Sequence, residues 1–221
     1  MKELVIFDID NTIIKGQSQR ILLGFVFKKG IINFFYYLKI LCWFLLYNLG
    51  IAKNPKRVME YALIFLNGKD ECYIEDIINE FFDKELKKYF FKEALELIDR
   101  HKKEGRKIVF VSTAIEPVIR KIAYYLGVKY YLATKLEIKN GRYTGKIDGE
   151  IVYGKNKINR LKDFLEKNNF SLKNSWAYGD HISDLDILEV TSHPIVVNPD
   201  RILYKEAKKR GWNILNFIYS C

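Results

Sequence analysis

Two aspartates, Asp8 and Asp10, directly follow a run of apolar residues, Leu4–Phe7, near the start of the chain. The run predicts a short strand that is buried on both faces, as in the middle of a parallel sheet. Because one residue separates the aspartates, their carboxylates can lie close together on one side of the chain. Such a pair needs a cation between the carboxylates or pKa values that differ strongly, and either arrangement supports chemistry. The alternative for an isolated pair is a polar turn.

Polar side chains follow two further apolar runs of the chain. Ser112 comes after residues 107–111, and Asp180 and Asp184 come after a short run that ends at Gly179. The ligands of open α/β sheets bind outside the carboxyl ends of the strands. The sequence therefore predicts one site that brings these side chains to the first pair of aspartates.

Two lysines, Lys155 and Lys157, begin a predicted helix whose apolar positions face a core. The helix dipole disfavours positive charge at this end of a helix, so the lysines suggest a bound anion. The hydroxyl-rich turn at Ser112 also precedes a predicted helix, where backbone N–H groups can bind a phosphate. The alternatives are a simple helix cap at Ser112 and a solvated surface at the lysines.

The stretch between the first two predicted strands lacks strand alternation and predicts an all-helical insertion. An insertion at this place stands over the carboxyl end of the first strand and can act as a lid. The chain then divides into a core, residues 1–16 and 104–221, and a helical cap, residues 17–103. The predicted helices are 20–29, 31–49, 55–65, 73–89 and 91–103, with breaks at Gly30, Gly50 and Gly68.

Strand patterns return after the insertion, at residues 107–112 and 130–133. Residues 135–150 alternate on both sides of Asn140-Gly141, which predicts a β-hairpin. The predicted fold class is therefore α/β, with a parallel sheet interrupted by the helical insertion.

The composition indicates a globular protein with an excess of positive charge. The 221 residues carry a formal net charge of +10, which favours an anionic partner such as a phosphorylated metabolite or an anionic lipid surface, the alternative being a lysine-rich solvated surface. The basic residues are scattered and no nucleic-acid-binding signature appears, so we expect no nucleic-acid partner. Cys42, Cys72 and Cys221 form no Cys-x-x-Cys pair, and the N-terminus does not resemble a signal peptide, so we expect a cytoplasmic protein.

Residues 31–51 form an apolar, aromatic segment whose length matches a membrane-spanning helix of about 20 residues. Lys39 near its middle disfavours a single crossing, and such a crossing would separate Asp8 from the later strands. Two alternatives stay open: a buried or dimer-forming helix of the cap, and a helix lying in the anionic inner face of a membrane. The basic residues near the ends of the segment are Lys28, Lys29, Lys53, Lys56 and Arg57.

Taken in chain order, these segments resemble the four motifs of the haloacid dehalogenase-like (HAD) phosphohydrolase superfamily, over nearly the whole chain. Further segments resemble its phosphoserine-phosphatase-like branch, subfamily IB. The resemblance implies a Rossmann-like core with a parallel sheet and a helical cap of the C1 type inserted after the first strand. The motifs are Asp8-Ile-Asp10-Asn-Thr12, Val-Phe-Val-Ser112, Lys157 and Gly179-Asp180-His-Ile-Ser-Asp184, and the segments typical of the branch are Ser112-Thr-Ala-Ile-Glu116-Pro, Leu132-Ala-Thr134, Gly141-Arg-Tyr-Thr144-Gly145 and Val197-Asn198-Pro199-Asp200.

By this resemblance, Asp8 is the nucleophile that forms an aspartyl-phosphate, and Asp10 protonates the leaving oxygen and then activates water. The resemblance also implies Mg²⁺ as the cofactor. Its ligands would be Asp8, the backbone carbonyl of Asp10, and Asp180, with Asp184 supporting them.

The resemblance assigns the binding of the transferred phosphoryl group to Ser112 and Lys157, with Thr12 as a supporting hydroxyl. The family spacing selects Lys157 over Lys155. The implied activity is the Mg²⁺-dependent hydrolysis of a phosphomonoester.

Two positions differ from the phosphoserine phosphatase pattern. Gln17 stands where those enzymes carry a glutamate that receives the substrate amine, and Ser183 stands where they carry asparagine. A neutral Gln17 cannot form the same ion pair, which disfavours phosphoserine as the substrate. The aromatic cap segment and its flanking lysines instead motivate a lipid or other amphiphilic phosphomonoester, such as a lysophosphatidate or a phosphatidylglycerophosphate.

Other functions stay open from the sequence. One is a phosphatase of a small soluble metabolite. Two others are a catalytically silent, membrane-associated binding protein and a phosphotransferase that uses an acceptor other than water. The complete set of Asp8, Asp10, Lys157 and Asp180 disfavours the silent protein.

Overall fold

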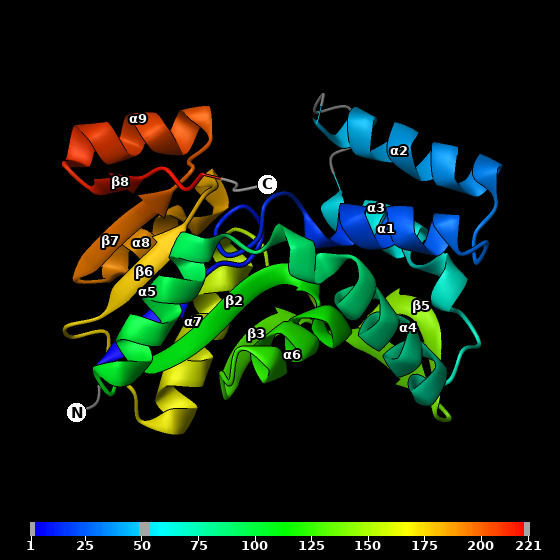
Figure 1. The fold of residues 1–221 in the computed structure, drawn as a ribbon, viewed down its shortest axis with the longest axis horizontal. Coiled ribbons are helices and arrows are strands. Elements are labelled where there is room, and N and C mark those ends of the chain that lie inside the picture. The colour runs from blue at the N-terminus through cyan, green and yellow to red at the C-terminus, as the bar shows by residue number, and fades with distance from the viewer. Residues whose placement is uncertain (1–2, 49–53, 219–221) are drawn as a thin grey trace.

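A parallel sheet of six strands forms the centre of the structure, a computed structural model that describes residues 3–48 and 54–218 (Figure 1). The strand order is β3-β2-β1-β6-β7-β8, and all neighbouring strands are parallel. Because β1 lies between β2 and β6, the residue that follows β1 emerges near the middle of the carboxyl edge of the sheet. The strands are β1 (Leu4–Phe7), β2 (Lys107–Ile115), β3 (Tyr130–Thr134), β6 (Trp176–Gly179), β7 (His193–Val197) and β8 (Asn213–Leu215).

Helices cover both faces of the sheet, and the alternation of side chains along β1 decides which helices each residue meets. Val5 and Phe7 belong to the apolar core under α5 and α6, whereas Leu4 and Ile6 belong to the core under α7, α8 and α9. All four side chains are buried, as the unbroken apolar run predicts. These helices are α5 (Lys92–Lys103), α6 (Glu116–Tyr125), α7 (Lys155–Asn168), α8 (Leu185–Val190) and α9 (Arg201–Arg210).

Four helices stand beside the sheet instead of on it, and we call them the cap (Figure 1). An antiparallel hairpin, β4 (Leu136–Lys139) and β5 (Arg142–Ile147), packs against the cap. The Tyr143 N–H donates to the Lys69 carbonyl and the Gly68 N–H donates to the Tyr143 carbonyl, each at 2.9 Å. The cap helices are α1 (Ser18–Lys28), α2 (Phe34–Asn48), α3 (Pro55–Ala62) and α4 (Glu71–Lys84), with short 3₁₀ turns η1 (Ile64–Leu66) and η2 (Leu86–Tyr89).

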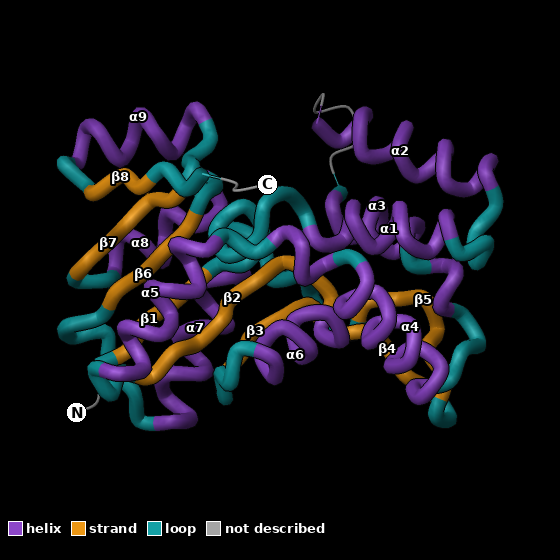
Figure 2. The backbone as a smooth tube through the Cα atoms, in the orientation of Figure 1, coloured by secondary structure: helices purple, strands orange, loops and turns teal. Residues whose placement is uncertain are grey.

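The two chain segments that connect the cap to the core pair with each other. Ile14 on the way in and Phe90 on the way out form an antiparallel bridge. α5 follows directly and packs on the sheet, where a ring nitrogen of His101 lies 2.9 Å from the Tyr178 hydroxyl of β6. The helical insertion expected at residues 17–103 therefore ends with one helix that belongs to the layers of the sheet (Figure 2).

All five predicted helices have somewhat different bounds in the structure, and two of the differences have a local cause. The helix predicted from residue 31 begins at Phe34, because Asn33 Oδ1 accepts the Tyr36 N–H at 2.9 Å and caps the helix start. The helix predicted over residues 73–89 is interrupted at Glu85, where the backbone leaves the helical region with φ −123° and ψ −60°.

The predicted strands and the hairpin are confirmed, with one extension. The strand predicted to end at Ser112 continues to Ile115 through an irregular pairing with β3. The hairpin turns at Asn140 and Gly141, whose positive φ values of 52° and 72° are those that this turn requires.

Part of the apolar segment 31–51 lies outside the described residues, including Leu49 and Gly50, and so do Lys53 and Cys221. Of the helices in the described residues, none combines the length and the apolar character needed to cross a membrane. α2, the described part of that segment, has 15 residues.

Candidate active site

The loop after β1 is wound tightly by its own backbone. The Ile9 carbonyl accepts the N–H groups of Thr12, Ile13 and Ile14 at 3.3, 2.8 and 3.0 Å. Asn11 lies in the left-handed region with φ 57°, which asparagine adopts more readily than most residues. The loop therefore holds the two aspartates of the first motif in a fixed position at the carboxyl edge of the sheet.

Asp10 lies where the core meets the cap. Its Oδ1 accepts the N–H of Ser18, the first residue of α1, at 2.9 Å, so it satisfies one of the free N–H groups of that helix start. Burial raises the pKa of Asp10 above its usual value, and the hydrogen bond from Ser18 lowers it in part. A carboxyl group with a raised pKa can hold a proton nearer neutral pH, which a general acid requires.

Three further carboxyl groups meet at the same edge, those of Asp8, Asp180 and Asp184. One oxygen of each lies within 4.8 Å of the others, and all three residues are buried. Lys157 enters from the first turn of α7, and its Nζ lies 2.5 Å from both Asp8 Oδ1 and Asp184 Oδ1. Lys155, the alternative lysine, is exposed. The structure thus brings together residues that are up to 176 positions apart.

Burial sets the protonation of this cluster. It raises the pKa of Asp8 to about 7, a shift that Lys157 opposes and Asp184 increases. Burial also raises the pKa of Asp180 well above its usual value, and Asp8 and Asp184 add to the shift. Burial alone would lower the pKa of Lys157, but the Asp184 and Asp8 carboxylates outweigh it and raise that pKa. The cluster therefore holds more acidic groups than its single ammonium can compensate.

Two residues that the sequence analysis did not assign to the site hold its acidic groups in place. Asn11 Nδ2 donates to Asp180 Oδ2 at 3.0 Å. Asp200 Oδ2 accepts the Ile182 N–H at 2.9 Å, and Oδ1 of the same carboxylate caps α9. The Pro199-Asp200 pair is a helix-start signal from which the capping role, but not the bond to the distant loop, could be predicted.

Ser112 and Thr12, both expected to contact a phosphate, occupy different places. Ser112 is buried at the wall of the cavity described below, and its Oγ accepts the Ala114 N–H at 3.2 Å, which leaves its proton free to be donated. Thr12 is buried under the loop and is not among the residues that line this cavity. Its hydroxyl has no hydrogen-bond partner among the described residues.

A cavity of about 470 Å³, which we call the site cavity, lies over the carboxylates and extends to the cap. Its core side includes the acidic cluster and Lys157. Its cap side has a polar part at the start of α1 and an apolar part from α2 and α3. The polar residues of the cap side are Gln17, Gln19 and Arg20, and the apolar residues are Leu41, Phe44, Leu45, Pro55, Val58 and Met59.

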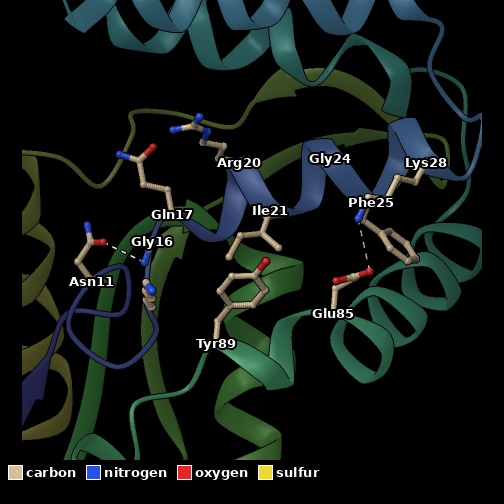
Figure 3. Close-up of a pocket in the computed structure, with 11 residues that line it drawn as sticks. Asn11, Gly16, Gln17, Arg20, Ile21, Gly24, Phe25, Lys28, Glu85 and Tyr89 are labelled. Carbon is tan, nitrogen blue, oxygen red and sulfur yellow. Dashed lines mark hydrogen bonds and ion pairs between the residues drawn. The ribbon is translucent and has the colours of Figure 1, made fainter. Parts of the chain in front are cut away.

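A second cavity of about 570 Å³ runs along α1 (Figure 3). It shares Asn11, Gln17 and Arg20 with the site cavity. Further along α1 it is lined by Lys28, which pairs with Glu85 at 3.9 Å. It includes none of the clustered carboxylates. We therefore place the chemistry in the site cavity.

The acidic cluster is chemically suited to Mg²⁺. The three groups offer only oxygen donors, which Mg²⁺ prefers, and they are close enough to share one ion. If all three are ionised, Lys157 leaves two buried negative charges, and a divalent cation would balance them. The residues that the motifs predict as metal ligands through their side chains therefore fit this cofactor.

The arrangement can perform acyl-phosphate chemistry, because a carboxylate nucleophile, a second carboxyl group and a fixed cation line one cavity. Residues 5–189 match the model of the haloacid dehalogenase-like hydrolase family. The chain belongs to this family.

Its relatives include phosphatases. The chain is 33% identical over 213 residues to the probable phosphatase Rv3661 of Mycobacterium tuberculosis (strain ATCC 25618 / H37Rv), an alignment that covers 96% of this chain and 74% of that protein. It is 29% identical over 241 residues to a histidinol-phosphatase of Neisseria meningitidis serogroup C (strain 8013), covering 98% of this chain and 100% of that protein.

Solved structures share the fold. A protein of unknown function from Bordetella pertussis Tohama I superposes with a TM-score of 0.90 at 24% identity, covering 97% of this chain and 98% of that chain. A substrate-bound phosphoserine phosphatase superposes with a TM-score of 0.69 at 20% identity, covering 97% and 93%. Together with the family match, these relatives confirm the α/β fold, the family and the phosphatase class that the motifs predict.

Proposed function

We propose that this protein hydrolyses phosphomonoesters through an aspartyl-phosphate on Asp8, with Mg²⁺ as the cofactor. The observation that carries the proposal is the position of Lys157, whose Nζ lies 2.5 Å from both Asp8 and Asp184 at the base of the site cavity. A buried ammonium between Asp8 and a neighbouring acid would stabilise the charge that develops on a transferred phosphoryl group.

In the first step, an Asp8 carboxylate oxygen attacks phosphorus, and the bond from phosphorus to the ester oxygen breaks. Asp10 gives its proton to the leaving oxygen, so that an alcohol departs. In the second step, Asp10 accepts a proton from water as the water oxygen attacks phosphorus. Inorganic phosphate leaves and the Asp8 carboxylate is restored.

Two side chains would hold the transferred group. Lys157 carries the positive charge, and the Ser112 hydroxyl has a proton to donate because its oxygen already accepts the Ala114 N–H. Mg²⁺ on Asp8 and Asp180 would supply charge stabilisation at the phosphoryl oxygens. The Asn11 amide and the Asp200 carboxylate keep the Asp180 loop in position.

The preferred substrate in this proposal is a phosphomonoester with an apolar part. The support comes from the apolar part of the cap wall, where Leu41, Phe44 and Leu45 of α2 line the site cavity. Leu45 is also 59% exposed to solvent, so the cavity wall continues onto the outer surface of α2. A chain bound along this wall could extend out of the cavity.

The outer face of α2 supports an anionic membrane surface as the place where such a substrate is met. Phe34, Phe35 and Leu38 are exposed on this face together with Leu45, a composition typical of helices that lie in a membrane interface. The net charge of +10 favours an anionic surface.

A phosphatase of a small soluble metabolite is the second candidate. It is favoured by the relative that is named a histidinol-phosphatase and aligns over its full length. The polar start of α1, with Gln17 and Arg20 in the cavity wall, provides room for a polar substrate group.

The test is phosphate release from a series of alkyl phosphates of increasing chain length, with Mg²⁺ and with EDTA. We expect activity to require the metal and to fall by about 10³-fold or more in Asp8→Asn, and by about 10²- to 10⁴-fold in Asp10→Asn. Asp163→Asn, an exposed acid on α7, is the matched control and should retain full activity.

The chain-length profile separates the two substrate classes. A rise of kcat/KM with chain length supports the amphiphilic substrate, and a preference for short polar esters supports the soluble metabolite. If the ester is consumed without release of phosphate and the phosphoryl group is transferred to an added alcohol, the protein is a phosphotransferase. Activity that is unchanged in Asp8→Asn would overturn the mechanism.

A further inference from the structure

Arg20 gives the site cavity a positive charge on its cap side. It lies in the first turn of α1, and among the described residues that line this cavity it is the only lysine or arginine contributed by the cap helices. The other lysine or arginine of the cavity wall is Lys157, on the core side and engaged by two carboxylates. The two cations therefore lie on opposite walls of one cavity.

The guanidinium of Arg20 has no ion-pair or hydrogen-bond partner within residues 3–48 and 54–218. Two other polar residues of α1 do have partners. Gln19 donates to the Thr113 carbonyl at 3.4 Å, and Lys28 pairs with Glu85. In Figure 3 the side chains of Gln17 and Arg20 project from the start of α1 on the side away from Tyr89 and Glu85. Arg20 is thus available to a ligand in the cavity.

The charge of Arg20 is not needed to balance the three clustered carboxylates. Lys157 and a divalent cation together match the charge of the three clustered carboxylates, and Asp10 is satisfied by the Ser18 N–H. A free guanidinium is suited to binding a carboxylate or a phosphodiester, since its planar fork pairs with two oxygens at once. Gln17, beside it in the wall, is neutral and would not repel such an anion.

We propose that Arg20 binds a second anionic group of the substrate, so that the enzyme selects phosphomonoesters that also carry a carboxylate or a phosphodiester. This inference rests on the proposed function and narrows its substrate class. The phosphoryl group lies at Asp8 and Lys157, and the second anion lies at the start of α1. The apolar wall of α2 and α3 is left for any remaining hydrocarbon.

The test uses alkyl phosphates of one chain length that end in a methyl group, an ammonium, a carboxylate or a methyl phosphodiester. We expect the wild-type protein to prefer the two anionic esters. In Arg20→Gln, kcat/KM for these esters should fall by about 10- to 100-fold, mainly through KM, as expected for one charge-assisted contact. The methyl-terminated ester should change by less than about twofold in the same variant.

Two variants separate the effect of the positive charge from that of the planar guanidinium group. Lys28→Gln removes a positive charge from the same helix outside the site cavity and should leave all four esters unchanged. Arg20→Lys keeps the charge but loses the planar fork, and it should retain part of the preference. A preference for the phosphodiester over the carboxylate would indicate a lipid-like substrate, and the reverse would indicate an organic acid phosphate.

Binding of the same esters to Asp8→Asn, measured by calorimetry with and without Arg20→Gln, separates this inference from the proposed function. Stronger binding of the anionic esters that depends on Arg20 supports the inference, whether or not the wild-type protein turns them over. Equal affinity for anionic and neutral esters, or an equal loss for all four in Arg20→Gln, would overturn it.

Discussion

Gly179 ends β6 at the point where the backbone passes directly behind the Asp184 carboxylate. A Cβ at this position would lie 2.8 Å from Asp184 Cβ and Oδ2 and 2.9 Å from its Cγ. These separations are far below the ordinary contact distance of carbon atoms. Asp184 cannot easily move, because it is buried and bonded to Lys157. The glycine is therefore required by the close approach of a carboxylate and not by an unusual φ.

We predict that Gly179→Ala weakens Mg²⁺ binding by about 10- to 100-fold, because Asp184 must leave the position that Lys157 and the other carboxylates define. The free energy of unfolding in EDTA should also fall, by about 1–3 kcal/mol for the added methyl group. Calorimetric titration with Mg²⁺ and urea unfolding measure the two effects.

Gly24→Ala is the matched control for this substitution. Gly24 lies within α1 and nothing stands within 4 Å of a Cβ at that position, so its Mg²⁺ affinity should equal that of the wild-type protein. If Gly179→Ala also bound Mg²⁺ with unchanged affinity, Asp184 would not belong to the metal site.

The residues that carry charge could be found from the sequence, since Asp8, Asp10, Lys157 and Asp180 each stand at a predictable strand end or helix start. Their supporting partners could not be found in this way. Asn11 donates to Asp180 across 169 positions of the chain, and a single asparagine in a turn gives no signal of such a partner. Contacts of this kind depend on the order of the strands in the sheet, and this order cannot be deduced from the local residue pattern.

Within the described part of the cap, most of the large apolar side chains that are exposed belong to α2. Phe35 is 80% exposed and Leu45 59%, while Ile40 on the opposite side is fully buried. The helix is held by this inner side, where Tyr37 stacks on Phe27 with ring centroids 4.4 Å apart. The two alternatives for the segment 31–51 thus apply to different sides of α2, because its inner side is packed and its outer side is exposed to solvent.

We predict that Phe35→Ser combined with Leu38→Ser reduces binding to vesicles of anionic lipid by about tenfold or more, because each exposed side chain contributes about 1.5–3 kcal/mol when it is buried in a membrane interface. Sedimentation with vesicles measures the effect, and added salt should weaken binding of the wild-type protein. The free energy of unfolding should change little, since both side chains are exposed.

Tyr124→Ser is the control for a lost exposed aromatic side chain, because Tyr124 on α6 is 83% exposed and lies outside the cap. It should bind vesicles like the wild-type protein. If the wild-type protein does not bind vesicles but forms a dimer that the double variant abolishes, the outer face of α2 is a dimer interface instead.

At the level of elements, the prediction from sequence is accurate where one short segment carries the whole signal. β1 and β2 are unbroken apolar runs, and the hairpin carries its own turn signal at Asn140-Gly141. The interruption at Glu85 was not predictable, because no glycine or proline marks it. Pro117 does mark the start of α6 after β2, but nothing in the sequence signals the irregular pairing of β2 with β3 between Val111 and Ile115.

At the scale of the whole molecule, His101 joins the helix that follows the cap to the centre of the sheet. It is 3% exposed, its Nε2 lies 2.9 Å from the Tyr178 hydroxyl, and its Nδ1 lies 3.0 Å from Arg106 Nη1. Because arginine can only donate, Nδ1 must be the acceptor, which fixes the neutral imidazole with its proton on Nε2. Burial, together with the neighbouring Arg106 and Arg100, lowers the pKa of His101 to about 4.

This histidine makes the stability of the protein depend on pH. Its pKa is near 6.5 in the unfolded chain and about 4 in the folded protein. The unfolded chain therefore binds the proton first as the pH falls, so the stabilisation is complete above pH 6.5 and is lost between pH 6.5 and pH 4. We predict that the free energy of unfolding of the wild-type protein falls by roughly 3 kcal/mol more than that of His101→Gln over this interval. Urea unfolding in EDTA measures the free energy of unfolding of both proteins. Subtracting one pH profile from the other cancels the contribution of the carboxyl groups, which titrate in both proteins. Parallel curves would mean that His101 is protonated alike in both states, which the Arg106 contact does not allow.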